Sequence, residues 1–567
     1  MEARLSLVQL VGIWVLAGLM ITGIGLAATY LMKPFRVSGL SERIRGALWF
    51  GLLVTTVIAM GVQLFSGLTQ GPARWVFIGL LAGSILVWVI FLTRHRTLGT
   101  HSFMRVLLGL VPILIGLILV GGWALGEPTN YDTGLYHLGA ISYAQDHPVI
   151  PGLANLHERF GFNSAMWPLA AALANLSGVT DAFRLVNGLI VLFVLFDLVL
   201  RLMRTDGSRR WSPGTFVLLL GLTIVVGAMA LYPGRLVATA SQDTAALLLG
   251  LVAIAYLSDA IKGRGADAST VYVAIGTSVL LGVMRPLGWV FFVALLMSLA
   301  LLGRQSRSPV IFRSGAGWVF GLAAAAVAVV LARDVMLSGW LGFPLSLAPM
   351  PVDWLHPDPE HASRDILGWA RTPFQPVDVT LASNSWITGW LLRLPTDWAV
   401  VALVGLLALA GLLVRIHRPL RPGTWANIAL TLVPVGTSMV VWLITAPDPR
   451  FAWGPMLALG LVPVSFLASQ SDVRWMLLIS TAVVVSLFSL AAVRGAFVGW
   501  SSVATPAPPV DVREASLADG TVVTVPSVGD QCWAIYPLCR PDYAPMDVEL
   551  RGEAFPDGFR PSQPVSK

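Results

Sequence analysis

The ionisable side chains that could carry out chemistry gather in one interval, residues 127–167, of an otherwise apolar half of the chain. The interval reads EPTNYDTGLYHLGAISYAQDHPVIPGLANLHERFGFNSAMW and contains Asp132, Tyr136, His137 and Arg159. Loops between membrane spans that are this rich in ionisable groups are more often working surface than connector. We therefore expect this interval to be the catalytic loop of a membrane enzyme.

Asp132 has two interpretations. It precedes an apolar-periodic stretch that predicts a short amphipathic helix ending before Pro148, so its side chain could simply cap that helix. Alternatively, Asp132 is a general base or a metal ligand, with Tyr136 and His137 one turn further along. Aromatic and apolar neighbours near a membrane interface can raise the pKa of such a carboxylate into a useful range. The histidines of the loop lack the HExxH spacing that would predict a zinc site.

A second carboxylate, Asp243, stands at the start of a later apolar segment, in the motif ASQDTAALLL. It too could be a helix cap. As a functional group it would face the acids of the 127–167 interval across the outer mouth of a helix bundle. Two carboxylates that are brought together from separate segments suit metal-assisted or acid–base transfer.

Three arginines, Arg235, Arg285 and Arg450, lie beside apolar segments and away from the main basic clusters. An arginine at membrane depth is costly unless it is paired. One interpretation is a structural ion pair with an acid such as Asp243 or Asp448. The other is a phosphate clamp, because a guanidinium group binds phosphate oxygens in bidentate fashion. A phosphate held at the outer-leaflet interface would indicate a lipid phosphate.

The composition shows what must position these residues. The chain has 567 residues, of which 56% are hydrophobic and 12% are charged. A soluble protein would carry roughly twice that charged fraction, and repeated apolar runs of about 20 residues can cross a bilayer as helices. We expect an all-α polytopic membrane protein. The net charge of +7 comes without a basic patch interleaved with aromatic residues, so no nucleic-acid partner is expected.

The apolar runs predict about 14 transmembrane helices. They are expected at about 5–32, 46–66, 73–93, 103–126, 183–203, 211–232, 241–260, 270–285, 287–303, 315–333, 397–414, 424–446, 452–469 and 475–495. The chain then divides into N-terminal helices (1–126), an outer catalytic loop with an interfacial helix (127–182), a helical bundle (183–333), a second outer loop (334–396), C-terminal helices (397–495) and an extracytoplasmic tail (496–567).

Basic residues cluster in alternate connections, which the positive-inside trend assigns to the cytoplasm. Both termini, the 127–182 loop, the 334–396 loop and the tail are then expected outside a bacterial plasma membrane. This orientation requires that Asn163–Ser177 does not fully cross. With about 15 residues and a proline, that segment is short for a span, and an interfacial or re-entrant helix fits better.

The second outer loop (334–396) and the tail (496–567) each contain sequence features that predict local structure or a site. In the tail, ASLADGTVVTV predicts a small hairpin with an Asp-Gly turn. Cys532 and Cys539 are expected to form a disulfide on the oxidising side of the membrane, two free thiols being the alternative. In the second loop, Asp353, His356 and Glu360 could join a site, although ordinary solvated side chains explain them more simply.

The layout resembles the GT-C superfamily of membrane glycosyltransferases. YDTGLYH matches the position of the catalytic acid in the large outer loop of those enzymes, which carries that role over to Asp132, and ASQDTAALLL resembles the start of a later span, carried over to Asp243. The resemblance implies a polyprenyl-phosphate sugar as donor. The chain also resembles a group of bacterial membrane proteins with YDTGLYH, PGLANLH, GFNS, PVDW, PDPRF and a GDQCW…C ending, which implies no activity.

These observations lead to the hypothesis of an inverting glycosyltransferase of the outer membrane face, which transfers a sugar from a polyprenyl-phosphate donor to a glycan, lipid or protein acceptor of the cell envelope. Asp132 would deprotonate the acceptor hydroxyl, and His137 or Asp243 would orient the acceptor or a divalent cation (Mg²⁺ or Mn²⁺). Arg285 and Arg450 would hold the lipid phosphate. The remaining expected substrate contacts are Tyr136, Arg159 and Arg235.

Other functions remain as alternatives. A transporter or flippase for a lipid-linked precursor would use the same arginines, but it needs polar residues on several mid-membrane helix faces, for which Asp197 is one candidate. A glycan polymerase or ligase would share the lipid-phosphate donor. Nothing in the sequence resembles a Walker loop, a nucleophile elbow or a dinucleotide fingerprint.

Overall fold

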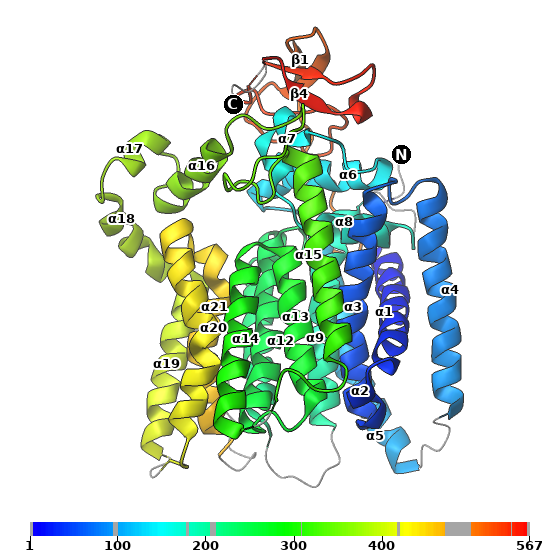
Figure 1. Ribbon diagram of the computed structural model, residues 1–567, viewed down its shortest axis with the longest axis vertical. Coiled ribbons are helices and arrows are strands. Elements are labelled where there is room, and N and C mark those ends of the chain that lie inside the picture. The colour runs from blue at the N-terminus through cyan, green and yellow to red at the C-terminus, as the bar shows by residue number, and fades with distance from the viewer. Residues whose placement is uncertain are drawn as a thin grey trace.

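The computed structural model describes residues 4–94, 100–176, 181–203, 211–307, 309–416, 420–470, 501–545 and 547–563 of a mostly helical protein (Figure 1). Among these residues, eleven helices are long and apolar enough to cross a membrane. Counting the short turns that lead into α9 and α21, they are α1 (Leu7–Tyr30), α3 (Leu40–Gln63), α4 (Gly71–Arg94), α9 (Val186–Leu202), α10 (Pro213–Leu231), α12 (Gln242–Lys262), α14 (Leu287–Ser306), α15 (Ala316–Ser338), α19 (Trp398–Ile416), α20 (Thr424–Thr445) and α21 (Trp453–Ala468).

The prediction of a polytopic helical protein is confirmed. Each predicted span from 5–32 to 452–469 coincides with a helix, and the two that are not among the eleven are α5 (Thr100–Ala124) and α13 (Ala268–Met284). Their described apolar parts, Gly109–Ala124 and Ala268–Met284, are shorter than the other spans. The last predicted span, 475–495, lies outside the described residues.

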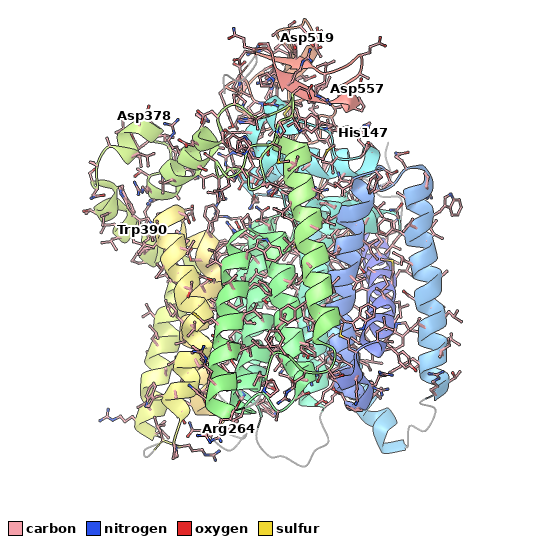
Figure 2. The ribbon with its side chains drawn as sticks, in the orientation of Figure 1. His147, Arg264, Asp378, Trp390, Asp519 and Asp557 are labelled. Atoms are coloured by element: carbon pink, nitrogen blue, oxygen red, sulfur yellow. A yellow bond between two sulfur atoms is a disulfide. The ribbon has the colours of Figure 1, made fainter. Side chains whose placement is uncertain are left out.

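The predicted outer regions lie together at one end of the bundle. This end carries the short helices α6 (Leu138–Asp146) and α7 (Leu153–Leu156), the arm formed by α16 (Pro359–Arg371), α17 (Val377–Leu381) and α18 (Trp386–Arg393), and the tail (Figure 1). Figure 2 shows His147, Asp519 and Asp557 at this end and Arg264, one of the clustered basic residues, at the other. The start of α1 lies at the same end as the tail, because the amide of Leu7 donates to the carbonyl of Ser502 at 2.9 Å. The arrangement agrees with the predicted grouping of the loops.

The segment whose crossing was in question forms α8 (Met166–Ala174), a helix of nine residues. At 1.5 Å per residue it is about 14 Å long, roughly half the apolar thickness of a bilayer. All nine residues are buried, against α3, α6 and the turn before α9, so α8 is not an amphipathic helix lying on a membrane surface. Its length and burial favour the re-entrant interpretation over the interfacial one.

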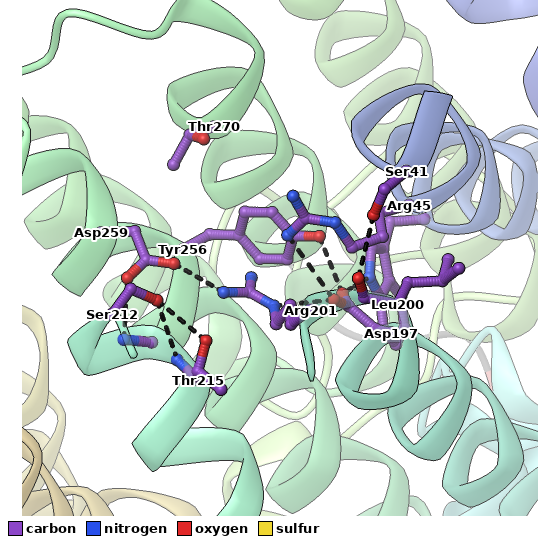
Figure 3. A network of polar contacts seen from close by, with 12 residues as sticks. Ser41, Arg45, Asp197, Leu200, Arg201, Ser212, Thr215, Tyr256, Asp259 and Thr270 are labelled. Atoms are coloured by element: carbon purple, nitrogen blue, oxygen red, sulfur yellow. Dashed lines mark hydrogen bonds and ion pairs between the residues drawn. The ribbon is translucent and has the colours of Figure 1, made fainter. Parts of the chain in front are cut away.

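A buried ion network ties the helices together at the end of the bundle opposite the outer loops (Figure 3). Asp197 on α9 accepts hydrogen bonds from Trp49 Nε1 (2.6 Å), Tyr256 OH (2.8 Å) and Arg201 Nε (2.7 Å). Arg201 also donates a hydrogen bond to Oδ2 of Asp259, on α12, at 2.6 Å. The other carboxylate oxygen of Asp259 accepts a hydrogen bond from the amide of Gly214 at the start of α10. Asp197 is fully buried and fully engaged in these contacts. Through these contacts it joins α3, α9 and α12.

The tail contains two small antiparallel sheets. Strands β1 (Val512–Ser516) and β2 (Val522–Pro526) form the predicted hairpin, with Gly520 of the Asp-Gly turn at a φ of +86°. Strands β3 (Val548–Leu550) and β4 (Phe559–Pro561) form the second sheet. The predicted disulfide between Cys532 and Cys539 is present, with Cα atoms 5.9 Å apart.

Candidate functional site

Two adjoining cavities lie at the end of the bundle that carries the arm and the tail, the end predicted to be the outer one. The larger, about 760 Å³ and here called the outer chamber, lies between the 131–159 segment, the arm and the residues before α21. The smaller, about 210 Å³ and here called the inner chamber, is bordered by the starts of α12 and α14. The two cavities adjoin, because five residues line both: Asp132, Arg159, Ile366, Arg450 and Phe451.

Asp132 enters this space at the start of a π-helix, η1 (Thr133–His137), which continues directly into α6. Single π-helical turns of this kind occur often at functional sites. The Asp132 side chain makes no capping hydrogen bond to η1. Instead its Oδ2 accepts a hydrogen bond from Nη1 of Arg450 at 2.9 Å. The helix-cap interpretation of Asp132 is therefore wrong.

The pairing with Arg450 also decides the charge of Asp132. Burial raises the pKa of this carboxyl, but the positive charge of Arg450, with a smaller contribution from Arg159, outweighs burial and leaves the pKa below its ordinary value. The sequence suggested that apolar surroundings could raise this pKa. The difference arises because the positive charge of Arg450, which lies more than 300 positions away in the sequence, stabilises the ionised form of Asp132.

Tyr136 and His137 follow Asp132 on η1 and line the inner chamber. The rings of Tyr136 and His137 have centroids 4.5 Å apart, and both contact Trp167 of α8. Burial lowers the pKa of His137 to about 4, against the opposing charges of Asp132 and Asp243, so the imidazole is neutral near neutral pH. Its Nδ1 atom is buried and has no hydrogen-bond partner among the described residues, so it is available to a ligand.

Asp243 and Arg285 form the second ion pair of the site. Ser241 caps α12 by accepting the amide of Asp243 at 3.3 Å, so Asp243 lies in the first turn and is not itself the cap. Pro286 disfavours helical geometry in the residue before it, and Arg285 accordingly adopts an extended backbone where α13 ends. From there Arg285 Nη1 donates to Asp243 Oδ1. The predicted structural pairing of Arg285 is confirmed.

The motif PDPRF brings the two ion pairs together. Asp448 caps the short helix η5 (Pro449–Ala452) by accepting the amide of Arg450 at 3.0 Å, and Pro449 occupies its first position. Phe451 then lies between the two arginines. The guanidinium carbon of Arg285 is 4.3 Å from the centre of its ring, and that of Arg450 is 4.7 Å away. This double cation–π contact holds both cations beside the inner chamber.

A narrow apolar groove of about 40 Å³ continues from the inner chamber between α12, α14, α20 and α21. Its walls are side chains such as Leu247, Ile254, Phe291 and Val435. Five residues line both the groove and the inner chamber: Asp243, Arg285, Leu287, Arg450 and Phe451. The two arginines therefore stand where polar space meets apolar space.

The other predicted substrate contacts also reach the chambers. Arg159 pairs with Asp365 of α16 and, at 3.8 Å, with Glu158, so it joins the two outer loops. Arg235, on the short helix α11 (Pro233–Leu236), is exposed in the outer chamber, and no described carboxylate lies within ion-pair distance of it. All eight predicted catalytic or substrate-binding residues thus line these two chambers.

The candidate site residues of the second loop, Asp353, His356 and Glu360, line neither chamber. Asp353 binds Arg551 of the tail through both carboxylate oxygens, at 2.8 and 3.1 Å. Glu360 accepts a hydrogen bond from Ser346, and His356 packs against Phe343. The chamber instead receives Asp365 from this loop, five positions beyond Glu360 on α16. The rotation of α16 distinguishes Asp365 from Glu360, and the sequence carries no signal for it.

The tail completes the outer chamber, which the sequence did not indicate. Tyr131 OH donates to Asp530, and both residues line the chamber with Tyr543. The amide of Trp533, beside the disulfide, donates to the carbonyl of Gly134 on η1 at 2.8 Å. A Cβ atom placed on Gly134 would lie 2.5 Å from the Trp533 ring, so glycine permits this close approach. The disulfide loop therefore rests directly on the helix turn that carries Asp132.

Among the described residues, no group of three or more His, Cys, Asp and Glu side chains has the arrangement of a metal site. Positive charge at the inner chamber comes from Arg159, Arg285 and Arg450.

Comparison with known proteins gives one match. The model of a protein family described as a domain of unknown function (DUF8201) matches residues 8–457. This match does not assign the chain to the GT-C superfamily. No curated protein gives a significant match. No solved structure does so either.

Proposed function

The chain belongs to the DUF8201 family, and from the geometry of its site we propose that it is a glycosyltransferase that uses a polyprenyl-phosphate sugar as donor. It transfers the sugar, with inversion at the anomeric carbon, to a hydroxyl of a cell-envelope acceptor on the outer face of the membrane. The acceptor belongs to the glycans, lipids or proteins of the envelope.

One observation carries this proposal: two arginine–carboxylate pairs, Arg450–Asp132 and Arg285–Asp243, meet around Phe451 where polar chambers adjoin an apolar groove. A lipid-linked sugar has the same three parts, an apolar chain, a phosphate and a polyol. The arginines suit the phosphate, and the chambers suit the sugar and the acceptor. The groove, at about 40 Å³, is smaller than one isoprene unit, so it would have to widen to admit the start of the chain.

The phosphate would compete with the carboxylates for the two guanidinium groups. A phosphodiester can accept bidentate hydrogen bonds from Arg285 and Arg450, which now donate to Asp243 and Asp132. When Arg450 turns to the phosphate, the contact that lowers the pKa of Asp132 weakens. Donor binding would thereby convert Asp132 from an ion-pair partner into a base, which ties activation of the acceptor to the presence of donor.

In the transfer step, a carboxylate oxygen of Asp132 takes the proton of the acceptor hydroxyl. The acceptor oxygen forms a bond to the anomeric carbon, and the bond from that carbon to the phosphate oxygen breaks. The electron pair of the broken bond leaves with the polyprenyl phosphate, which gains one negative charge. Arg285 and Arg450 stabilise that charge as it develops.

His137 and Tyr136 would position the acceptor. The neutral imidazole of His137 has a free Nδ1 atom in the inner chamber, where it can hydrogen-bond an acceptor hydroxyl. Tyr136 presents an aromatic ring beside it. Arg235, exposed in the outer chamber, would attract the anionic donor before the phosphate reaches the inner arginines.

The proposal is tested with the purified full-length protein, labelled short-chain polyprenyl-phosphate sugars and a cell-envelope fraction as acceptor. We expect donor loss that depends on acceptor and is abolished by Asp132→Asn, whereas Asp378→Asn, on the exposed helix α17, retains wild-type turnover. Full turnover by Asp132→Asn would overturn the catalytic assignment. Labelled lipid that crosses the bilayer of proteoliposomes without being consumed would identify a transporter instead.

A further inference from the structure

A third cavity lies within the arm, at the outer end of the bundle beside the tops of α19, α20 and α21 (Figure 1). It has a volume of about 490 Å³ and is enclosed by the end of α16, α17, α18 and the turns between them. It borders the outer chamber only through Pro373 and Phe374. The function proposed above does not use this cavity.

The cavity is positively charged. Arg371, at the end of α16, and Arg393, at the end of α18, both line it, and none of its described lining residues is acidic. No described carboxylate lies within ion-pair distance of either arginine. Arg393 donates to the backbone carbonyl of Arg371, which holds the two positive side chains near each other despite their repulsion. Such an arrangement favours an anionic ligand.

Three polar atoms in the cavity wall lack partners. Nε of Arg371, Nε1 of Trp386 and Oγ1 of Thr380 are buried, and none has a hydrogen-bond partner among the described residues. Two of these atoms can only donate, and the third can donate or accept. Buried polar groups in proteins are almost always hydrogen-bonded, so these three unpaired atoms, on residues that line one space, can bind an acceptor in it once their side chains turn toward it. An oxyanion with several acceptor oxygens would satisfy all three.

The rim of the cavity is apolar. Phe374 and Val379, which line it, are 86% and 64% exposed, and α18 adds the exposed side chains of Ile387, Leu391 and Leu392. α18 also carries Trp386 and Trp390, a residue type enriched at the level of lipid headgroups. The arm stands at the ends of the helices that are long enough to cross a membrane, where the headgroup layer is expected.

We propose that the arm holds the phosphate of an anionic glycerophospholipid of the outer leaflet, with Arg371, Trp386 and Thr380 as donors. Arg393 adds charge, and the acyl chains lie along Phe374 and the exposed face of α18. The site anchors the arm over the outer chamber. It is separate from the donor phosphate site at Arg285 and Arg450, so either assignment can fail without the other.

The test is native mass spectrometry of the full-length protein in mild detergent, with added phosphatidylglycerol. We expect the wild type to retain one lipid that Arg371→Gln/Arg393→Gln retains about tenfold less, since charge-assisted hydrogen bonds to one phosphate are lost. Arg371→Lys, which keeps the charge but loses Nε, is expected to fall between them. The control is Arg364→Gln, on the same helix but outside the cavity, with its side chain 54% exposed.

Melting temperatures without added lipid establish that each variant is folded. Equal retention of phosphatidylglycerol by the wild type and the double variant would overturn the proposal. So would equal retention, by the wild type, of a glycosyl diacylglycerol with the same acyl chains, because that lipid has no phosphate. If glycerol 1-phosphate stabilises the wild type alone and no lipid is retained, the ligand is a soluble phosphate and the lipid assignment is wrong.

Discussion

The Nη1 atom of Arg450 lies 2.9 Å from Oδ2 of Asp132, although 318 positions separate the two residues in the chain. This contact joins the first outer loop to the segment that leads into α21, and it keeps the Asp132 carboxylate ionised. In the proposed function the contact also creates a competition, because Arg450 can bind either Asp132 or the donor phosphate, and Asp132 can bind either Arg450 or the acceptor hydroxyl. The predictions that follow depend on this competition and on the elements that hold it in place.

Asp132→Asn is expected to lower the rate of donor consumption by at least about 100-fold, since a positioned general base contributes on the order of 10²–10⁴ to a rate. The amide cannot take the acceptor proton, but it can still accept a hydrogen bond from Arg450 and preserve the packing. The rate is measured as loss of labelled polyprenyl-phosphate sugar. Asp378→Asn serves as the exposed control, and a rate loss below about tenfold would remove Asp132 from the base position.

The pH dependence should differ between kcat/KM and kcat. The active form of Asp132 is the carboxylate, so activity is lost as the pH falls through its pKa. In the free enzyme Arg450 holds that pKa below its ordinary value, which places the acidic limb of kcat/KM below the usual carboxyl range. With donor bound, Arg450 turns to the phosphate, the pKa rises, and the acidic limb of kcat moves to higher pH. If the acidic limbs of kcat/KM and kcat lie at the same pH, Arg450 does not exchange Asp132 for the donor phosphate.

Arg450→Lys should raise the KM for donor and lower kcat, because an ammonium group keeps the charge but loses the bidentate geometry for phosphate. A loss of one or two charge-assisted hydrogen bonds corresponds to about a tenfold to hundredfold decrease in kcat/KM. Initial rates over a range of donor concentrations measure both parameters. Arg364→Lys is the matched control, as its only described ion pair is with Asp358 at 3.7 Å. An unchanged KM would place the phosphate elsewhere.

The pair of Asp243 and Arg285 should show strong coupling in stability. Both side chains are largely buried, with 8% and 13% of their surface exposed. Removing one partner leaves a buried charge without compensation, which costs about 3 kcal/mol, whereas removing both costs less. We therefore expect Asp243→Asn to lower the melting temperature more than Asp243→Asn/Arg285→Gln does. Additive decreases in the double variant would show that the two side chains do not interact.

Much of the fold follows from local properties of the sequence, but the assembly of the site does not. The spans and the tail hairpin were predictable because apolar length and an Asp-Gly turn act within a few neighbouring residues. Asp132 lines the chambers together with the other predicted site residues, but the direction of its pKa shift was not predictable, since that direction comes from Arg450. The place of Phe451 between two arginines depends on packing among segments far apart in the chain.

The position of Asp365 illustrates the same limit. It resembles Asp353 as an acid in the second outer loop, but Asp365 faces Arg159 and Asp353 faces the tail. Which acid points inward is set by the rotation of α16 and by where the tail docks. The tail's contribution of Asp530 and Tyr543 was equally hidden, because no composition or spacing in the sequence links the 530–543 segment to the 131–143 segment.

The contact between Gly134 and Trp533 should couple the tail to catalysis. Gly134→Ala would place a methyl group 2.5 Å from the Trp533 ring, so the disulfide loop or η1 must move, and the donor-consumption rate is expected to fall about tenfold as Asp132 leaves its productive geometry. Hydrogen exchange across residues 131–143 should rise at the same time. Gly12→Ala, which meets no atom within 4 Å, is the control. The second-site change Trp533→Leu should restore part of the rate in the Gly134→Ala protein by making room for the methyl group. If Gly134→Ala changes neither rate nor exchange, the tail does not position Asp132.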